Sequence, residues 1–298
     1  MLDGDVTVHE AELLYGPFGR ASVKPYAMTR RAVDGGSLLK VYAGIDTEGR
    51  RHREAETVRR AARWGLSVPE VMATGRCDGG SWSVFRMLPG VPCGVGTDRA
   101  IEEYIDHVLG LTDSLHRSSP DLNPGSGWSG ERGRRPATQR QFLLDQLSQR
   151  CRQQPWWAAL AEALRPLESH PVVYLHGDLK PEHLLVHDHQ LSVVDWEASA
   201  RGPAAVDYTD VVFHLVRDLL YTGAKPDRVP IDLITRLPFN GPVLAWRVLL
   251  WLDRRRPQDI DLIAARNVHR LAAEDHAVTG YASLARTVSA LHTAGVPR

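Results

Sequence analysis

Two short segments in the second half of the chain constrain its fold most. Residues Tyr174–Val186 read Tyr-Leu-His-Gly-Asp-Leu-Lys-Pro-Glu-His-Leu-Leu-Val, and residues Val193–Glu197 read Val-Val-Asp-Trp-Glu. The first predicts an apolar strand, a tight polar loop and a second strand, and the second predicts a further strand that ends in acidic residues. Together they predict a small hairpin that presents two carboxylates, Asp178 and Asp195, at its edge.

Phosphoryl transfer from a nucleotide uses two such carboxylates. One orients or deprotonates the acceptor hydroxyl, and the other holds the magnesium ion that bridges the phosphates. The chain resembles the aminoglycoside phosphotransferase-like kinases, a group that includes choline kinase-like proteins. Their signature is His-Gly-Asp, four further residues, Asn, and later an Asp at a strand end. Here His176-Gly177-Asp178 and Asp195 match it, whereas His183 stands at the Asn position.

The resemblance covers about residues 12–215 and implies an α+β fold class, in a bilobal protein-kinase-like arrangement. A small β-rich N-lobe, with a nucleotide-binding sheet and one helix, is expected over residues 1–88. A larger, mainly helical C-lobe, with the catalytic loop, the metal site and the acceptor-binding helices, is expected over residues 89–298. The residue patterns agree, since strand-like segments dominate before Pro89-Gly90 and helical patterns dominate after it.

The individual elements are expected from the same patterns. Strands of the N-lobe region are expected at Ala11–Leu14, Ala21–Arg30, Leu38–Tyr42 and Trp82–Leu88. Its helix is expected at Glu48–Trp64, a charged, Ala-rich segment with no Gly or Pro after Gly49. Helices of the C-lobe region are expected at Arg99–His116, Thr138–Gln153, Trp156–Leu167, Val206–Tyr221, Val243–Arg255 and, with breaks, Gln258–Ala294.

Lys40 places a cation among the apolar residues of its strand. A lone Lys in such a strand usually faces solvent, but here an acidic helix follows at a suitable distance. Glu54 can turn inward from that helix and pair with Lys40, which would hold the ammonium against the α- and β-phosphates of a nucleotide. Glu56 is the alternative partner. We favour Glu54 because its spacing to Val58 and Ala61 places it on the apolar side of the helix.

Two further segments are expected to contact the nucleotide. The turn from Gly16 to Gly19 is either a loop whose backbone N–H groups approach the phosphates or an ordinary surface turn, and Pro17 removes one of those donors. Arg86 and Leu88 lie where the two lobes should join, so their backbone groups are expected to hold the adenine. This second expectation rests on position alone.

The His-Gly-Asp loop supplies the expected catalytic residues. Asp178 is expected to be the base or the carboxylate that positions the acceptor, and His176 should hold the loop by hydrogen bonds. Lys180 is similar in position to the lysine with which protein kinases reach the γ-phosphate. Asp207 matches a later acidic position of the family, and the resemblance implies that it fixes the catalytic loop by accepting hydrogen bonds.

Asp195 is expected to hold the metal, with Glu197 on the same face of the strand. His183 departs from the family, because imidazole suits transition metals better than Mg²⁺. Three outcomes follow: one metal held by Asp195 and Glu197 suffices, Mn²⁺ is preferred, or the chain binds nucleotide without turnover. Since Lys40 and both motif aspartates are present, we favour an active enzyme that uses ATP and Mg²⁺.

Composition bears on partners and on the compartment. Lys plus Arg and Asp plus Glu number 36 each, so the net charge gives no indication of nucleic acid or of an anionic membrane as partner. The acidic N-terminus is not a signal peptide, and no apolar stretch is long enough to span a bilayer. Cys77, Cys93 and Cys151 are dispersed, without a Cys-x-x-Cys pair, which suits a reducing cytoplasm.

Charge in the C-terminal region bears on the acceptor. Residues 221–298 carry eleven Lys or Arg and seven Asp or Glu, a net charge of plus four. This disfavours a polycationic aminoglycoside and leaves neutral or anionic hydroxyl compounds, among them secondary metabolites and Ser or Thr of a peptide. Kinases that resemble this family also act in the biosynthesis of modified peptides of the lanthipeptide and thioamitide type, where a separate lyase partner would be required.

Two alternatives stay open at this point. The chain is either an active kinase or a nucleotide-binding pseudokinase subunit of a peptide-modifying dehydratase complex. Likewise, Ser118–Ala137, which is rich in Gly, Pro and Arg, is either a solvated linker between helices, which loop statistics favour, or a basic flap over the active site.

Overall fold

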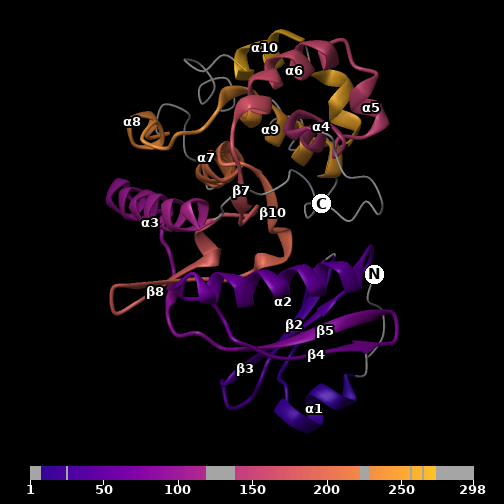
Figure 1. The fold of residues 1–298 in the computed structure, drawn as a ribbon, viewed down its shortest axis with the longest axis vertical. Helices are drawn as coiled ribbons and strands as arrows, with labels where there is room; N and C mark the ends of the chain where they lie inside the picture. Colours follow the sequence, from indigo (N-terminus) through magenta and orange to yellow (C-terminus); the bar gives the residue numbers. More distant parts are fainter. Residues whose placement is uncertain are drawn as a thin grey trace. The chain divides into compact units, whose positions relative to one another are not determined.

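The structure, a computed structural model, describes residues 8–24, 26–118, 138–221, 229–255, 257–263 and 265–272. The described residues form two compact units. The first comprises residues 8–93 and 182–199, and the second comprises the remainder. The first unit is rich in strands and the second is mainly helical (Figure 1), which confirms the predicted α+β, protein-kinase-like fold class.

The first unit contains a five-stranded antiparallel sheet of β1 (Ser22–Lys24), β2 (Ala27–Arg31), β3 (Ser37–Tyr42), β4 (Val71–Cys77) and β5 (Gly80–Arg86). The strands are arranged in the order β1-β2-β3-β5-β4, so β3 is central. Leu39 and Val41 from β3 join Trp82 from β5 in an apolar core on one face of the sheet. Because side chains alternate along a strand, Lys40 and Tyr42 point to the opposite face.

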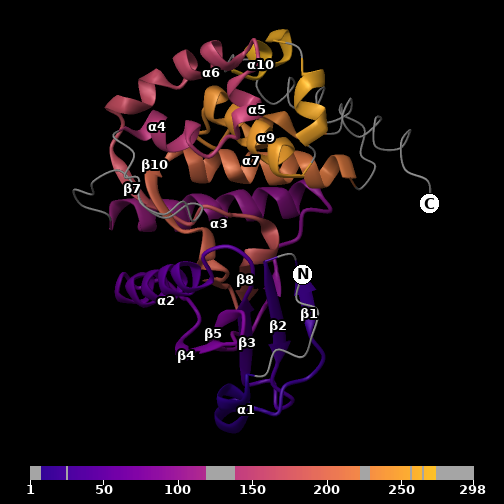
Figure 2. The same ribbon diagram turned by 90° about the vertical axis from the view of Figure 1, so that its right-hand side faces the viewer.

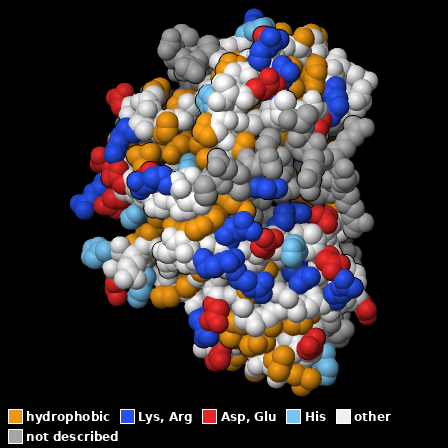
Figure 3. Space-filling model, viewed as in Figure 1, with side chains coloured by type: hydrophobic (Ala, Val, Ile, Leu, Met, Phe, Trp, Pro, Cys, Tyr) orange, Lys and Arg blue, Asp and Glu red, His pale blue; other side chains and the backbone are white. Residues whose placement is uncertain are grey.

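Helix α2 (Thr47–Arg63) lies against this sheet (Figure 1). Its buried residues recur at the spacing of one helix face. They are Glu54, Ala55, Thr57, Val58 and Ala61. Its other face is rich in arginine, and basic side chains gather on the face of the molecule that carries α2 (Figure 3). The predicted helix, Glu48–Trp64, is displaced by one residue.

The first expected strand is wrong. Ala11–Leu14 belongs to a helix, α1 (His9–Tyr15), that ends at Gly16. Ala11 is buried in the apolar core, whereas Leu13 and Leu14 are exposed, so the run contacts the core with one helical face only. The four residues Ala-Glu-Leu-Leu are too few to distinguish helix from strand by periodicity.

Strand β4 was not predicted from the sequence, because Gly75 interrupts its pattern. Gly75 lies against the ring of Trp82, and a Cβ atom at this position would collide with the ring. The glycine therefore permits close approach of the backbone to the indole. A register shift between Val71 and Ala73 adds a second irregularity to the pairing of β4 with β5.

A second sheet of the first unit comes from two distant parts of the chain. It consists of β6 (Val91–Pro92), β8 (Leu184–His187) and β9 (Gln190–Val193), in the order β6-β8-β9. The backbone N–H of Val193 donates to Ser67 O at 2.9 Å, and the 3₁₀ turn η3 (Trp196–Ala198) packs on α2. The predicted division at residue 88 assigned residues 182–199 to the C-lobe, whereas these contacts group them with the first unit.

The second unit packs α7 (Ala205–Tyr221) against α9 (Gly241–Arg255), as Figure 2 shows. Most of α9 is buried, which is typical of a helix at the centre of an α-helical core. Strands β7 (Val172–Leu175) and β10 (Ala200–Pro203) pair with each other. The other elements are α3 (Asp98–Arg117), α4 (Gln139–Leu144), α5 (Gln149–Arg152), α6 (Trp157–Ala163), η1 (Arg165–Ser169), α8 (Ile231–Ile234), η5 (Pro257–Leu262) and α10 (Ala265–Ala272).

Three expected helices are interrupted. Thr138–Gln153 is divided into α4 and α5, and Trp156–Leu167 changes to the 3₁₀ helix η1, where Pro166 lacks the N–H that an α-helix needs. Of Gln258–Ala294, the described part forms η5 and α10, and the rest lies outside the described residues. The loop expected at Ser118–Ala137 also lies outside them, except for Ser118. In the described part of the chain, no helix is long and apolar enough to cross a membrane.

Candidate active site

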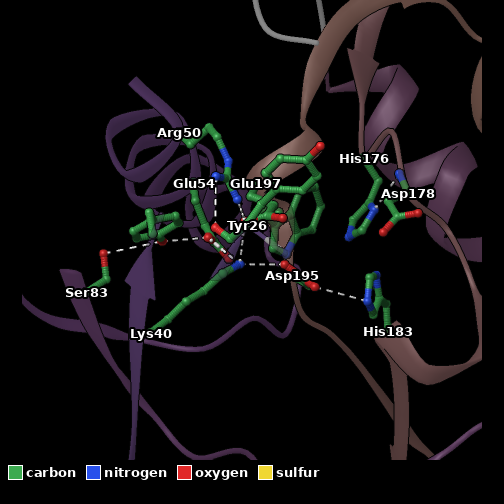
Figure 4. Close-up of polar contacts among 12 residues, drawn as sticks. Tyr26, Lys40, Arg50, Glu54, Ser83, His176, Asp178, His183, Asp195 and Glu197 are labelled. Atoms are coloured by element: carbon green, nitrogen blue, oxygen red, sulfur yellow. Dashed lines mark hydrogen bonds and ion pairs between the residues drawn. The ribbon is translucent and has the colours of Figure 1, made fainter. Parts of the chain in front are cut away.

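Lys40 is the centre of a charged network in the first unit. Its side chain is buried beside α2, with a relative exposure of 6%. Its Nζ atom lies 2.9 Å from Glu54 Oε2, 2.6 Å from Asp195 Oδ1 and 3.0 Å from Glu197 Oε2 (Figure 4). The hydroxyl of Tyr42 donates to Glu54 Oε2 at 2.6 Å. One buried ammonium is thus shared by three carboxylates.

The pKa values follow from this crowding. Burial alone would lower the pKa of Lys40, but the carboxylates of Asp195, Glu54 and Glu197 outweigh burial and raise it well above its usual value. Burial raises the pKa of Glu54, and the Lys40 ammonium only partly opposes that rise. Lys40 is therefore firmly protonated in the folded protein.

The face of α2 on which each residue lies decides whether Glu54 or Glu56 pairs with Lys40. Glu54 is 3% exposed and faces Lys40, as predicted. Glu56 is exposed and forms an ion pair with Arg60 on the outer side of α2. The predicted Lys40–Glu54 ion pair is confirmed.

Asp195 occupies an unusual backbone conformation at the end of the second expected motif. Its φ and ψ angles of 65° and 60° lie in the left-handed region, which non-glycine residues rarely adopt. This turn directs Oδ1 to Lys40 and Oδ2 to His183 Nε2, the latter at 3.1 Å. Burial alone would raise the pKa of Asp195, but Lys40 and His183 hold it well below its usual value.

Glu197 does not lie where it was expected. The left-handed turn at Asp195 ends the extended chain, so Glu197 lies on η3 and not on the face of a strand. Its carboxylate is held by Lys40 and, at 2.9 Å, by Arg50 Nη2. Arg50 also donates from Nη1 to the carbonyls of Tyr26 and Ala43, both at 3.0 Å. Arg50 was missed because nothing distinguishes it from the other arginines of α2.

The His-Gly-Asp loop lies in the second unit and follows β7. The Asp207 carboxylate accepts the backbone N–H of Gly177 at 2.9 Å and that of His176 at 3.1 Å. Its Oδ2 also lies 3.1 Å from His116 Nε2. Gly177 has a φ of 78°, in the left-handed region that favours glycine. His176 Nδ1 accepts the Asp178 N–H at 3.3 Å, so the predicted loop contacts of both His176 and Asp207 are present.

Asp178 lies between two nitrogen bases. Its Oδ2 is 3.1 Å from Lys180 Nζ, and its Oδ1 is 3.2 Å from His214 Nε2. His214 had not been predicted as part of the site. Neither had Asp210 and Arg247, which extend the cluster, although Asp210 and His214 are spaced by one helical turn within a predicted helix.

Comparison with known proteins shows the family. The sequence profile of the phosphotransferase enzyme family, APH, matches residues 29–226. The chain belongs to this family. It is an enzyme, a phosphotransferase that acts on an alcohol group. A search of curated proteins found no match to this phosphotransferase.

Solved structures resemble the phosphotransferase in fold. Aminoglycoside phosphotransferase APH(3'')-Id from Streptomyces rimosus is 15% identical, with a TM-score of 0.55, over 81% of this chain and 94% of that chain. A thermostable mutant of aminoglycoside phosphotransferase APH(4)-Ia, in a ternary complex with ADP and hygromycin B, is 16% identical, with a TM-score of 0.56, over 93% of this chain and 97% of that chain. At these identities the likeness bears on the fold alone.

Three carboxylates of the phosphotransferase offer ligands of the kind that a hard cation prefers, and Lys40 already contacts each of them. Oxygen atoms of Glu54, Asp195 and Glu197 lie within 4.8 Å of one another. Carboxylate oxygens are the ligands that Mg²⁺ prefers. His183 points its Nε2 atom at Asp195, so it holds a candidate ligand in place by a hydrogen bond.

The remaining predicted residues belong to the first unit, and of these only Arg86 lies in a strand of its sheet. The backbone N–H of Gly16 donates to Glu12 O at 3.0 Å, and that of Gly19 donates to Arg31 O at 2.7 Å. These two donors therefore serve the fold. Arg86 ends β5, where its N–H donates to Glu70 O, and Leu88 follows in the segment before β6. Their contacts with a nucleotide stay predictions.

Proposed function

We propose that this protein transfers the γ-phosphate of ATP, with Mg²⁺, to a hydroxyl of a non-polycationic acceptor. The acceptor would be a secondary metabolite or a Ser or Thr of a biosynthetic peptide. The observation that carries the proposal is the buried Lys40, which is shared by Glu54 and Asp195 as a phosphate-binding lysine and its partners would be. The ADP and hygromycin B bound by the APH(4)-Ia mutant support a nucleotide and a hydroxyl compound as ligands.

In the first unit, Lys40 would bind the α- and β-phosphates while Glu54 holds it from α2. Asp195 and Glu197 would hold the metal ion, which supplies positive charge to the phosphates when it is bound. His183 would hold Asp195 through Oδ2. Arg50 would keep Glu197 in place from the other side.

In the second unit, Asp178 would orient or deprotonate the acceptor hydroxyl. A base must hold one position to act within hydrogen-bond reach of its proton. Asp207 supports this role, because it fixes the backbone N–H groups of His176 and Gly177, the two residues before Asp178. Lys180 would bind the transferred phosphoryl group from the same loop.

Charge around Asp178 supports the proposed acceptor class. Lys180 and His214 contact the carboxylate directly, and Arg247 lies behind His214. The Lys180 ammonium next to Asp178 disfavours a polycationic acceptor and tolerates a neutral or anionic one. A lyase partner and a cytoplasmic location belong to the peptide version of the proposal, and the three free cysteines support the reducing compartment.

One observation favours a second candidate, a catalytically weak, nucleotide-binding subunit of a peptide-modifying complex. Both oxygens of Asp195 are engaged, by Lys40 and by His183, and His183 replaces the carbonyl ligand that the family's Asn offers. A metal ion would have to compete with the ammonium for Asp195. Turnover separates the two candidates, and ATP binding alone does not.

The test is ATP turnover by the full chain with Mg²⁺ or Mn²⁺. Acceptors would include a neutral macrolide, a polycationic aminoglycoside and Ser-containing peptides of acidic and basic composition. We expect phosphate on a neutral or acidic acceptor, detected by mass spectrometry, and none with Asp178→Ala. Preferred phosphorylation of the aminoglycoside would contradict the acceptor class, and ATP binding without any transfer would favour the second candidate.

A further inference from the structure

A buried chain of polar groups leads away from Asp178 in the second unit. Arg247 Nε donates to Asp210 Oδ1 at 2.6 Å, and the same oxygen lies 3.5 Å from His214 Nε2. His214 Nε2 lies 3.2 Å from Asp178 Oδ1. Asp210 is fully buried and His214 is 2% exposed, whereas Asp178 is partly exposed. The groups come from α7, from α9 and from the loop after β7.

A metal ion does not suit this cluster, although Asp178, Asp210 and His214 have the right atom types and spacing. The Arg247 guanidinium already supplies the positive charge at Asp210 and lies 3.4 Å from His214 Nε2. A divalent cation added there would be repelled by it. Burial alone would raise the pKa of Asp210, but Arg247 and His214 hold it below its usual value, so Asp210 is a carboxylate.

The contacts assign the proton on the imidazole. Two carboxylates, Asp178 at 3.2 Å and Asp210 at 3.5 Å, approach Nε2, and a proton on this atom serves both. Arg247 Nη2, at 3.4 Å, is the one neighbour of Nε2 that such a proton does not serve, and Arg247 already donates to Asp210. The Nδ1 atom is buried and has no hydrogen-bond partner among the described residues, so a proton on it would be unsatisfied. His214 therefore donates its Nε2–H toward Asp178.

On the basis of the proposed function, we propose that His214 is a positioning residue for Asp178, aimed by Asp210 and Arg247. During transfer, the acceptor oxygen bonds to the γ-phosphorus, the bond to the bridging oxygen of ATP breaks, and ADP leaves with the electron pair. The hydroxyl proton passes to Asp178. His214 keeps its own proton and holds Oδ1 throughout, which favours the ionised form of the carboxylate that accepts the proton.

Two amide substitutions of His214 test this assignment, because neither amide titrates. In His214→Gln the amide nitrogen takes about the place of Nε2 and still donates to Asp178. In His214→Asn it falls short. We expect His214→Asn to lower kcat for ATP turnover, with water as acceptor, by about 10- to 100-fold, as expected for a lost hydrogen bond to a charged group. The KM for ATP should be unchanged, and the fall in rate on the acid side should begin at a higher pH.

His214→Gln should retain most of kcat and the wild-type pH profile. The kcat of Asp210→Asn should lie between those of His214→Gln and His214→Asn. This substitution removes the carboxylate that orients the imidazole but leaves the Nε2–H donor in place. Val216→Ala, a buried change on the same helix, is the control for packing and should leave both readouts unchanged.

The outcomes separate this inference from the proposed function. Wild-type kcat and pH profile in His214→Asn, with Asp178→Asn inactive, overturn the positioning role and leave Asp178 as the base. Equal losses in His214→Gln and His214→Asn, without a change in pH profile, also overturn it, because they indicate a structural role. Wild-type turnover in Asp178→Asn overturns the proposed function itself. If His214→Asn does not fold, the Asp210→Asn pH profile decides, since an unshifted profile contradicts the proposal.

Discussion

The two units place opposite arrangements of charge around their key residues. In the first, one ammonium, Lys40, is shared by three carboxylates, and Arg50 adds a second positive charge at Glu197. In the second, Asp178 lies between Lys180 and His214, and the acid behind them, Asp210, is matched by Arg247. The first network has acid in excess and suits the binding of a cation. The second is balanced and suits the holding of one carboxylate in one orientation.

The largest effect is expected at Asp178, because the second unit would act on the acceptor whereas the first would bind the nucleotide. Asp178→Ala should reduce transfer by about 10³-fold or more while leaving nucleotide affinity nearly unchanged, because the residue acts on the acceptor. Asp195→Ala should weaken the metal–nucleotide complex as well. Initial rates and calorimetric titration with ATP and Mg²⁺ measure both. Equal loss of nucleotide affinity in the two variants would remove the distinction between the units.

Within the acid-rich network, the central cation should matter more than any one acid. Lys40→Ala should lower both the rate and the nucleotide affinity, by about 10- to 100-fold in kcat/KM, since a phosphate contact acts in ground and transition states alike. Glu54→Gln should have the same effect more weakly. Glu56→Gln is the matched control on the same helix, and steady-state kinetics should show it to be silent. Damage from Glu56→Gln with a silent Glu54→Gln would contradict the pairing.

Within the balanced cluster, loss of one charge should appear as loss of stability. Asp210→Asn leaves Arg247 buried without its counter-ion and should lower the free energy of unfolding by about 3–5 kcal/mol. Because the folded-state pKa of Asp210 is lowered, its stabilisation is fully present above the unfolded pKa near ~3.9 and is lost as pH falls below it. Chemical denaturation of wild type and variant should differ at pH 7, and the difference should shrink progressively as pH falls below about 3.9. A difference that is independent of pH would contradict the ion-pair account.

The smallest effect is expected at His183, where the two candidate functions diverge. His183→Asn removes the hydrogen bond to Asp195 and adds an uncharged amide oxygen, which is a harder metal ligand than imidazole. Activity with Mg²⁺ should therefore be kept or raised. Rates measured against Mg²⁺ and Mn²⁺ concentration for wild type, His183→Asn and His183→Ala provide the test. Collapse of His183→Asn with both metals would show that the imidazole itself is required.

The sequence predicted the residues whose partners lie in short motifs or on a clear helix face. Lys40 with Glu54 followed from strand and helix spacing, and Asp207 with its loop followed from the family resemblance. Arg50 and Arg247 could not be found in this way, because each pairs with an acid that is distant in sequence. Arginines are common on helix surfaces, and only the tertiary structure distinguishes these two from the solvent-exposed arginines nearby.

Local backbone geometry explains the other differences. Because side chains alternate along a strand, the sequence predicted Glu197 on the same strand face as Asp195. The left-handed turn at Asp195 instead ends the strand, and Glu197 lies on η3. Such a conformation has no marker in the sequence, because Asp is not a residue that requires it. The short helix α1 was misassigned because a segment of four residues is too short to show a helical period.

The distribution of the first unit over two stretches of chain has a consequence for synthesis. Strand β6 pairs with β8, more than ninety residues later, so the second sheet cannot form until the ribosome has released residues 182–199. At about 5–20 residues per second, this leaves roughly 5–20 s during which β6 has no partner strand. In that interval the nascent five-stranded sheet holds Lys40 and Glu54 without Asp195. The charged network therefore closes late, and a truncated chain that ends before residue 182 would leave the buried ammonium with one carboxylate of its three.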